Sequence, residues 1–125
     1  MLQMKYVIIY VSNFEESLAF YCNQLGLSIR NNHGSYIELD TGSTILAMIL
    51  KENVNEMTGL PKPSDISSQT FELGFVTEDV IGMVEKLREN GVKIIKEPIE
   101  KPWGQTVAYV ADPDQHYIEI CSRVE

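Results

Sequence analysis

The fold is decided by one stretch near the N-terminus, YVIIYVSNFEESLAFYCNQLG at residues 6–26. Its first six residues are strongly apolar, which predicts a short strand buried on both faces. Asn13 and Glu16 have the spacing of a helix N-cap and its partner, and apolar residues then recur at helical intervals. Gly26 is typical of a left-handed helix end. The stretch therefore predicts a strand followed directly by a helix.

Three short strands are predicted after this helix, because β-prone segments alternate there with glycine-containing turns. The order then restarts after a segment rich in proline, glycine and serine. In the second half a strand precedes a helix that Asp79 caps and Gly91 ends, and three more strands follow. The predicted strands after the two helices lie near residues 27–31, 35–39, 44–50, 92–96, 106–111 and 117–121.

The two halves align as copies of one strand–helix–three-strand unit. Tyr6 falls on Glu72, Gly26 on Gly91, and Ala47 on Glu119, with small changes of offset inside loops. We therefore predict an α+β fold of two βαβββ modules within one domain spanning residues 1–125. Module one covers about residues 5–50, a linker covers 51–69, and module two covers about residues 70–122.

Composition excludes several classes of partner. The chain has 125 residues, 44% of them hydrophobic, and a formal net charge of −8. That charge disfavours nucleic acids and anionic membranes, which are bound through Lys and Arg. No apolar run approaches the roughly 20 residues of a membrane span, and no signal peptide is expected. Cys22 and Cys121 lack disulfide or zinc-site spacing, so we expect a cytoplasmic protein.

Several segments, in their order and spacing, resemble the vicinal oxygen chelate superfamily of glyoxalase I, bleomycin-resistance proteins, fosfomycin-resistance transferases and extradiol dioxygenases. The resemblance covers nearly the whole chain and is carried by residues 11–21, 25–27, 85–91, 102–105 and 110–120. It implies that the two βαβββ modules form an incomplete barrel around a cavity, and that the protein is a homodimer. The family usually has glycine at the position of Gln115, so we expect that residue in a conformation that glycine favours.

The same resemblance implies where a metal would bind. Metal-dependent relatives place ligands on the first and fourth strands of each module, at positions that correspond to Tyr6, Ala47, Glu72 and Glu119. Proteins similar to glyoxalase I have His or Gln, Glu, His and Glu there, so only Glu119 matches. The two-histidine patterns of the dioxygenases and fosfomycin transferases are missing as well. We therefore expect no cofactor.

Glu72 and Glu119 still require an explanation. If the family's sheet order holds, they lie on neighbouring strands with both side chains on the cavity face, where opposed residues come within about 4.5–5.5 Å at Cβ. Two carboxylates that close in a partly dry site are costly unless one keeps a proton or a cation lies between them. Three interpretations stay open: a site for Mg²⁺ or Mn²⁺, a carboxyl group that hydrogen-bonds a ligand, or glutamates satisfied by a neighbouring Arg, Lys or Tyr.

Other residues are candidates for ligand contacts. Strand alternation points Tyr6, Tyr10 and Tyr117 into the cavity, where Ala47 also lies. Trp103 precedes a strand and would either stack on a planar ligand or seal the edge of the barrel. The tyrosines would either donate hydrogen bonds to a ligand or serve as core aromatics. His33 and His116, the two histidines of the chain, are expected to be solvated turn residues.

Two functions follow from these observations. The first is a metal-free protein that binds a small molecule, similar to bleomycin-resistance proteins, with acidic residues suited to a cationic ligand. The alternative is a lyase or isomerase resembling glyoxalase I (lactoylglutathione lyase), with Mg²⁺, Mn²⁺, Ni²⁺ or Zn²⁺ held by Glu72 and Glu119 as the catalytic carboxylates. A homodimer whose cavity is filled by its own side chains is the third possibility. Whether the protein is an enzyme is left open.

Overall fold

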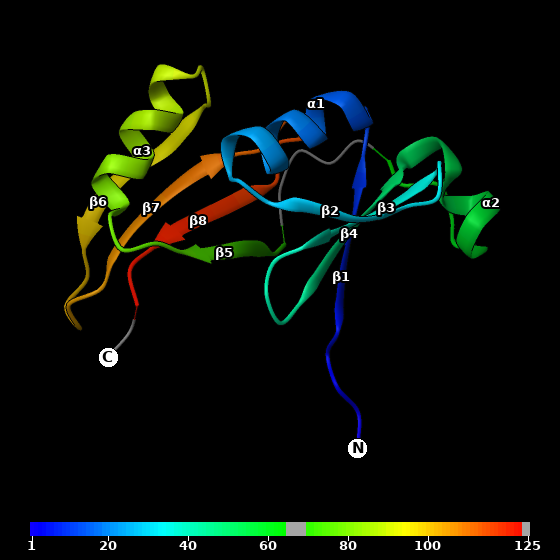
Figure 1. The fold of residues 1–125 in the computed structure, drawn as a ribbon, viewed down its shortest axis with the longest axis horizontal. Helices are drawn as coiled ribbons and strands as arrows, with labels where there is room; N and C mark the ends of the chain where they lie inside the picture. Colours follow the sequence, from blue (N-terminus) through cyan, green and yellow to red (C-terminus); the bar gives the residue numbers. More distant parts are fainter. Residues whose placement is uncertain (65–69, 124–125) are drawn as a thin grey trace. The chain divides into compact units, whose positions relative to one another are not determined.

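The computed structural model describes residues 1–64 and 70–123, and it divides the chain into two compact units, residues 1–65 and 66–125 (Figure 1). Unit one contains β1 (Tyr6–Val11), α1 (Phe14–Leu18), a π-helical segment (Ala19–Gln24), β2 (Ser28–Asn32), β3 (Tyr36–Asp40), β4 (Ile45–Leu50), a 3₁₀ turn (Lys51–Asn53) and α2 (Val54–Thr58). Unit two contains β5 (Glu72–Val76), α3 (Val80–Glu89), β6 (Ile94–Glu100), β7 (Thr106–Ala111) and β8 (Tyr117–Cys121). The predicted α+β class and its two βαβββ modules are confirmed.

The two sheets have the same topology. Their strand orders are β1-β4-β3-β2 and β5-β8-β7-β6, and in each the first strand pairs in parallel with the fourth. Tyr6 lies opposite Ile45 in the first sheet, and Glu72 lies opposite Tyr117 in the second. These are the residues that the sequence alignment of the halves superposes, so the duplication extends to the register of the strands.

The first helix begins where the sequence predicts. The Asn13 side chain accepts a hydrogen bond from the Glu16 amide at 2.9 Å, which satisfies one of the free N–H groups of the first turn. The helix continues as a π-helical segment from Ala19, a feature that apolar periodicity does not predict. Gly26 and Gly91 end their helical segments at φ values of 81° and 82°, a left-handed conformation that favours glycine.

Residues 51–58, predicted as the start of a linker, are helical instead. Val54 is fully buried and anchors the segment, and the Thr58 hydroxyl donates to the Val54 carbonyl at 2.6 Å. Gly59 then ends the helix with a positive φ of 78°. One buried valine thus orders a short polar segment whose composition resembles a loop. The end of the predicted linker, residues 65–69, lies outside the described residues.

Each sheet has one apolar face and one face that carries acidic residues. Ile9 and Met48 in unit one, and Ile118 and Ile120 in unit two, are buried on the apolar face, and in unit two α3 packs against β6, β7 and β8. We call the opposite face the carboxylate face. It carries Glu38 in unit one, together with Glu72 and Glu119 in unit two. No helix among the described residues is long and apolar enough to cross a membrane.

Candidate functional site

The carboxylate face of unit two brings three side chains together. Tyr109 on β7 lies directly opposite Glu119 on β8, and its hydroxyl is 3.1 Å from Glu119 Oε2. The same hydroxyl is 3.3 Å from Oε1 of Glu72 on β5. The phenol therefore contacts both glutamates that the sequence singles out.

Glu72 and Glu119 lie on neighbouring strands with their side chains on one face, as expected, but they are not directly opposed. The residue opposite Glu72 is Tyr117, and the residue opposite Glu119 is Gly74. A Cβ atom at Gly74 would lie 3.3 Å from Glu119 Oε1, tighter than most Cβ contacts. Because Gly74 has no side chain, the Glu119 carboxylate has room to lie over β5.

The acid–base properties of the neighbouring groups follow from burial and these carboxylates. Burial, and then the hydrogen bond and charge of Glu119, raise the pKa of Tyr109 to about 12. The same causes raise the pKa of the buried Cys121 thiol to about 11. At neutral pH Tyr109 is therefore a neutral hydroxyl donor, and Cys121 is a thiol and no ready nucleophile.

In unit one the strand position equivalent to Glu119 is Ala47, which has no carboxylate. Ala47 on β4 lies opposite Ile8 and Glu38, as Glu119 on β8 lies opposite Gly74 and Tyr109. Glu38 is on β3, two strands away from β1, whereas Glu119 is on β8, the immediate neighbour of β5. Glu38 therefore occupies the position in its sheet that Tyr109 occupies in the other.

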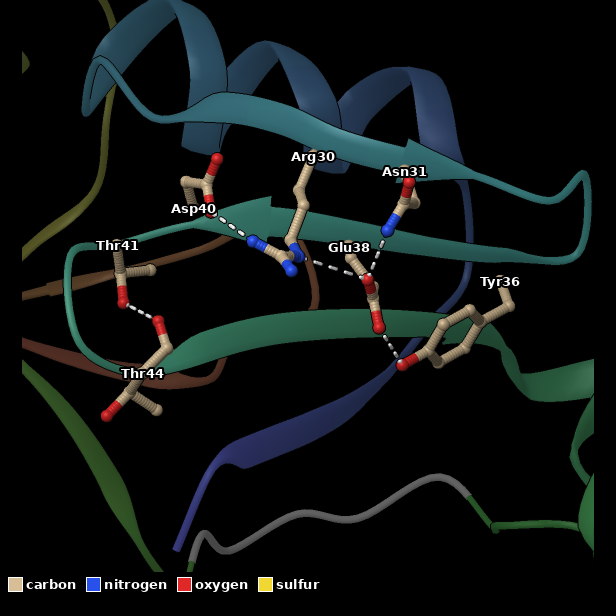
Figure 2. Close-up of polar contacts among 7 residues, drawn as sticks. All are labelled: Arg30, Asn31, Tyr36, Glu38, Asp40, Thr41 and Thr44. Atoms are coloured by element: carbon tan, nitrogen blue, oxygen red, sulfur yellow. Dashed lines mark hydrogen bonds and ion pairs between the residues drawn. The ribbon is translucent and has the colours of Figure 1, made fainter.

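Glu38 is held by several donors and is only 8% exposed. Asn31 Nδ2 donates to Oε1 at 2.8 Å, the Tyr36 hydroxyl donates to Oε2 at 2.7 Å, and Arg30 Nε lies 3.6 Å from Oε1 (Figure 2). The hydrogen bonds from Asn31 and Tyr36 lower the pKa of Glu38. Burial, and then the hydrogen bond to Glu38, raise the pKa of Tyr36 to about 12. Both carboxylate oxygens therefore have internal partners.

A β-bulge supplies the Arg30 contact. The register of β2 against β3 shifts between Ile29 and Asn31, so Arg30 and Asn31 both reach the carboxylate face rather than pointing to opposite faces. Arg30 also lies 3.5 Å from Asp40 (Figure 2). This side chain therefore lies between two acids of β3.

The other predicted ligand residues are distributed over both units. Tyr6, Tyr10 and Ala47 lie on unit one; Tyr6 is 51% exposed and Ala47 is fully buried. Tyr117 and Trp103 lie on unit two and are 39% and 62% exposed. The Trp103 indole N–H donates to Gln105 Oε1 at 2.9 Å, in the turn between β6 and β7. None of these residues hydrogen-bonds Glu72 or Glu119 among the interactions of the described chain.

His116 differs from its prediction, and Gln115 agrees with it. His116 is 12% exposed rather than solvated, and its Nδ1 lies 2.7 Å from the fully buried Asp112 carboxylate. Asp112 also accepts the amides of Asp114 and His116 at 2.9 and 2.8 Å, so it organises the turn between β7 and β8. Gln115 in this turn has φ 69°, the conformation expected from the family's glycine.

Sequence analysis missed Tyr109 and Glu38. Tyr109 is ten residues before Glu119 across a short turn, and pairing the last two strands as a hairpin would have placed it opposite that glutamate. Glu38 lies in a predicted strand whose neighbours Ile37 and Leu39 are apolar, so alternation marks it as facing away from them. Which donors surround it depends on the bulge at Arg30, for which the sequence carries no comparable signal.

The donor set of the described residues does not fit the metal site that the resemblance implies. Of the four family positions, Ala47 has no donor atom and Tyr6 offers a phenol. No group of three or more His, Cys, Asp and Glu side chains is gathered for an ion in the part of the chain that the structure describes. The Tyr109 hydroxyl contacts both of the remaining carboxylates.

The chain is similar to known proteins of one family. Residues 4–125 match the model of the glyoxalase-like domain, so the chain belongs to that family, within the vicinal oxygen chelate superfamily. It is 36% identical to the uncharacterized protein YraH of Bacillus subtilis, over 88% of this chain and 90% of the relative. It is 27% identical to a probable lactoylglutathione lyase of Synechocystis, over 92% and 91% of the two chains.

Solved structures share the fold. A glyoxalase/bleomycin resistance protein/dioxygenase family enzyme from Burkholderia phytofirmans superposes with a TM-score of 0.87 at 24% identity, covering 99% of this chain and all of the other. A glyoxalase/bleomycin resistance protein/dioxygenase from Nocardioides has a TM-score of 0.84 at 20% identity, covering 100% of this chain and 85% of the other. At these identities the likeness shows the fold alone.

Proposed function

We propose that this protein binds a small cationic molecule on the carboxylate face of unit two, as a metal-free member of the glyoxalase and bleomycin-resistance group. The ligand's N–H groups would lie against Glu72 and Glu119. The observation that supports this proposal is the contact of one hydroxyl, that of Tyr109, with both carboxylates.

Counting hydrogens explains why this contact favours a cation. A phenol has one hydrogen, and an ionised carboxylate only accepts hydrogen bonds. Tyr109 can therefore satisfy Glu72 or Glu119 at any moment, but not both. An ammonium, amidinium or guanidinium group supplies several N–H donors together with a positive charge, so it would displace water from these carboxylates and donate to both at once.

The rest of the molecule supports the same choice of ligand. The formal net charge of −8 attracts cations and repels anions at long range. Tyr117, directly opposite Glu72 on β8, is partly exposed and offers an aromatic surface beside the charged group. A ligand that joins a cationic group to a flat apolar body matches both features.

Benzamidinium and its neutral relative benzamide test the proposal. We expect benzamidinium to bind, and we expect Glu72→Gln and Glu119→Gln each to weaken that binding by about tenfold or more, because a charged hydrogen-bond partner is lost. Isothermal titration calorimetry gives the affinities, and thermal unfolding checks that the variants are folded.

Glu89→Gln on the exposed end of α3 is the matched control, since it removes the same charge from unit two. Its affinity for benzamidinium should equal that of the unsubstituted protein. Equal losses in all three variants would mean that only long-range charge attracts the ligand. Equal binding of benzamide would mean that the positive charge is not recognised.

A metal-dependent lyase is the second candidate, favoured by the names of the relatives. Besides the Synechocystis protein, a lactoylglutathione lyase of Neisseria meningitidis is 24% identical over 98% of this chain and 91% of the relative. Glu119 is the one residue that agrees with the family's ligand set. Elemental mass spectrometry after incubation with Mg²⁺, Mn²⁺, Ni²⁺ and Zn²⁺ in turn decides between the candidates. A stoichiometric ion that Glu119→Gln releases, together with lactoylglutathione turnover, would establish the lyase.

A further inference from the structure

We propose that Tyr109 determines the specificity of the unit-two site: its hydroxyl contacts one oxygen of Glu72 and one of Glu119, so a divalent metal ion that bridges these oxygens would have to displace it. The site therefore discriminates against metal ions in favour of N–H cations. The choice of N–H cations rests on the proposed function, whereas the discrimination against metal ions can be tested without any organic ligand.

The Tyr109 hydroxyl occupies space that a bridging metal ion would need. Tyr109 Oη is within 3.3 Å of Glu72 Oε1 and 3.1 Å of Glu119 Oε2. An ion such as Mn²⁺ or Zn²⁺ held by both carboxylates needs its oxygen ligands at about 2.0–2.2 Å. An ion bridging these two oxygen atoms would therefore compete with the hydroxyl for the same small volume.

The hydrogen of the Tyr109 phenol also opposes a metal ion electrostatically. A phenol carries one hydrogen, and the Tyr109 hydroxyl is within hydrogen-bond distance of both carboxylates, so it directs that hydrogen to one of them. A hydrogen directed at a carboxylate of the site repels a metal ion that approaches the same oxygen. Metal binding would have to break the Tyr109 hydrogen bond, which makes binding less favourable.

Removal of the hydroxyl should leave both carboxylates in place. The path of the Glu119 side chain depends on Gly74 of the neighbouring strand, where a Cβ would lie 3.3 Å from Glu119 Oε1. Glu72 and Glu119 also keep their places through the pairing of β5 with β8. Tyr109→Phe should therefore leave the Glu72 and Glu119 carboxylates on adjacent strands without the hydroxyl that contacts both.

The experiment is a Mn²⁺ titration of the unsubstituted protein and of Tyr109→Phe, by calorimetry and by the electron paramagnetic resonance signal of free Mn²⁺. We expect Tyr109→Phe to bind a single Mn²⁺ ion at least about tenfold more tightly. Adding Glu72→Gln to that variant should abolish the gain. Neither readout depends on catalysis.

Tyr36→Phe provides the matched control, because it also removes one phenol that hydrogen-bonds a glutamate. Glu38 keeps Asn31 and Arg30 there, so this variant should gain no Mn²⁺ affinity. If Tyr109→Phe unfolds, Tyr109→Leu removes the same hydroxyl and takes its place in the titration.

Equal Mn²⁺ affinities in the unsubstituted protein and Tyr109→Phe would overturn the proposal, as would tighter binding by the unsubstituted protein, which would make Tyr109 a metal ligand. Benzamidinium binding is scored separately. A protein that gains Mn²⁺ in Tyr109→Phe but never binds benzamidinium would refute the proposed function while retaining the role of Tyr109 against metals.

Discussion

The carboxylate faces of the two units are built on the same strand order and register, yet they treat their acidic groups differently. In unit one, Glu38 is buried and accepts hydrogen bonds from Asn31 and Tyr36, with Arg30 nearby. In unit two, the Tyr109 hydroxyl contacts both Glu72 and Glu119, and the Glu72 side chain is exposed. Both oxygens of Glu38 thus have internal hydrogen-bond partners, whereas Glu72 and Glu119 have one phenolic hydrogen between them.

The proposed binding role of unit two rests on this difference. A buried carboxylate with its own donors has little to offer a ligand. Two partly exposed carboxylates that share one phenolic hydrogen can accept further hydrogen bonds from a ligand that displaces water. The residues that distinguish the two cases lie on the strands next to the acid.

The largest effect expected concerns what the units share. Met48 and Ile120 occupy equivalent buried positions on β4 and β8. Met48→Ala and Ile120→Ala should each lower the free energy of unfolding by about 3 kcal/mol, because each leaves a cavity in an apolar core. Urea denaturation measures both. If one substitution lowers the free energy of unfolding by less than half as much as the other, the two apolar cores are not equivalent.

The next effect separates the two tyrosines. Tyr36→Phe should lower the free energy of unfolding by about 1 kcal/mol, since the buried Glu38 loses a hydrogen bond. Tyr109→Phe should lower it by only about 0.5 kcal/mol, because Glu72 is exposed and Glu119 is half-buried, so water can replace the lost hydrogen bond. The same denaturation experiment compares them. The reverse ranking would contradict the structural role assigned to unit one.

A smaller effect is expected in the turns that precede β4 and β8. The first turn has Gly42 at φ 105°, whereas the second holds Gln115 at φ 69°. Gln115→Gly removes the strain of a side chain in a left-handed conformation, partly offset by the greater freedom of an unfolded glycine. We expect a gain of about 0.5 kcal/mol in thermal or urea unfolding. A clear loss would mean that the Gln115 side chain makes a stabilising contact.

The smallest effect is a pH dependence of stability. The pKa of Glu38 is lowered in the folded state, so its ionised form stabilises the fold above the unfolded-state pKa of about 4.3. That contribution is lost as the pH falls through the folded-state pKa. The stability difference between the unsubstituted protein and Glu38→Gln should therefore be largest at neutral pH and should shrink below about pH 4. A difference that stays constant into acid would refute the assignment.

Much of the fold was accessible from the sequence, for identifiable reasons. Asn13 and the two glycines Gly26 and Gly91 mark helix ends through local chemistry, and the structure confirms them. The alternation of Ile118 and Ile120 fixed which face of β8 is buried. Such signals need only neighbouring residues, so a single sequence reveals them.

The candidate site was less accessible because it depends on pairing between distant strands. Family positions indicate Glu72 and Glu119, whereas Tyr109 belongs to the site only through the pairing of β7 with β8. The donors around Glu38 depend on a register shift in β2, and a shift of one residue reverses which side chains share a face. Likewise, the contact of His116 with Asp112 depends on how the turn closes.

The bulge at Arg30 limits how the side-chain contacts of one sheet could be redesigned onto the other. Because β2 contains one residue more than the paired segment of β3, its side chains no longer alternate strictly between the two faces of the sheet. Deleting a residue there would restore regular alternation and turn Arg30 or Asn31 away from Glu38. A redesign of either sheet therefore has to copy the number of residues in its edge strand as well as their identities.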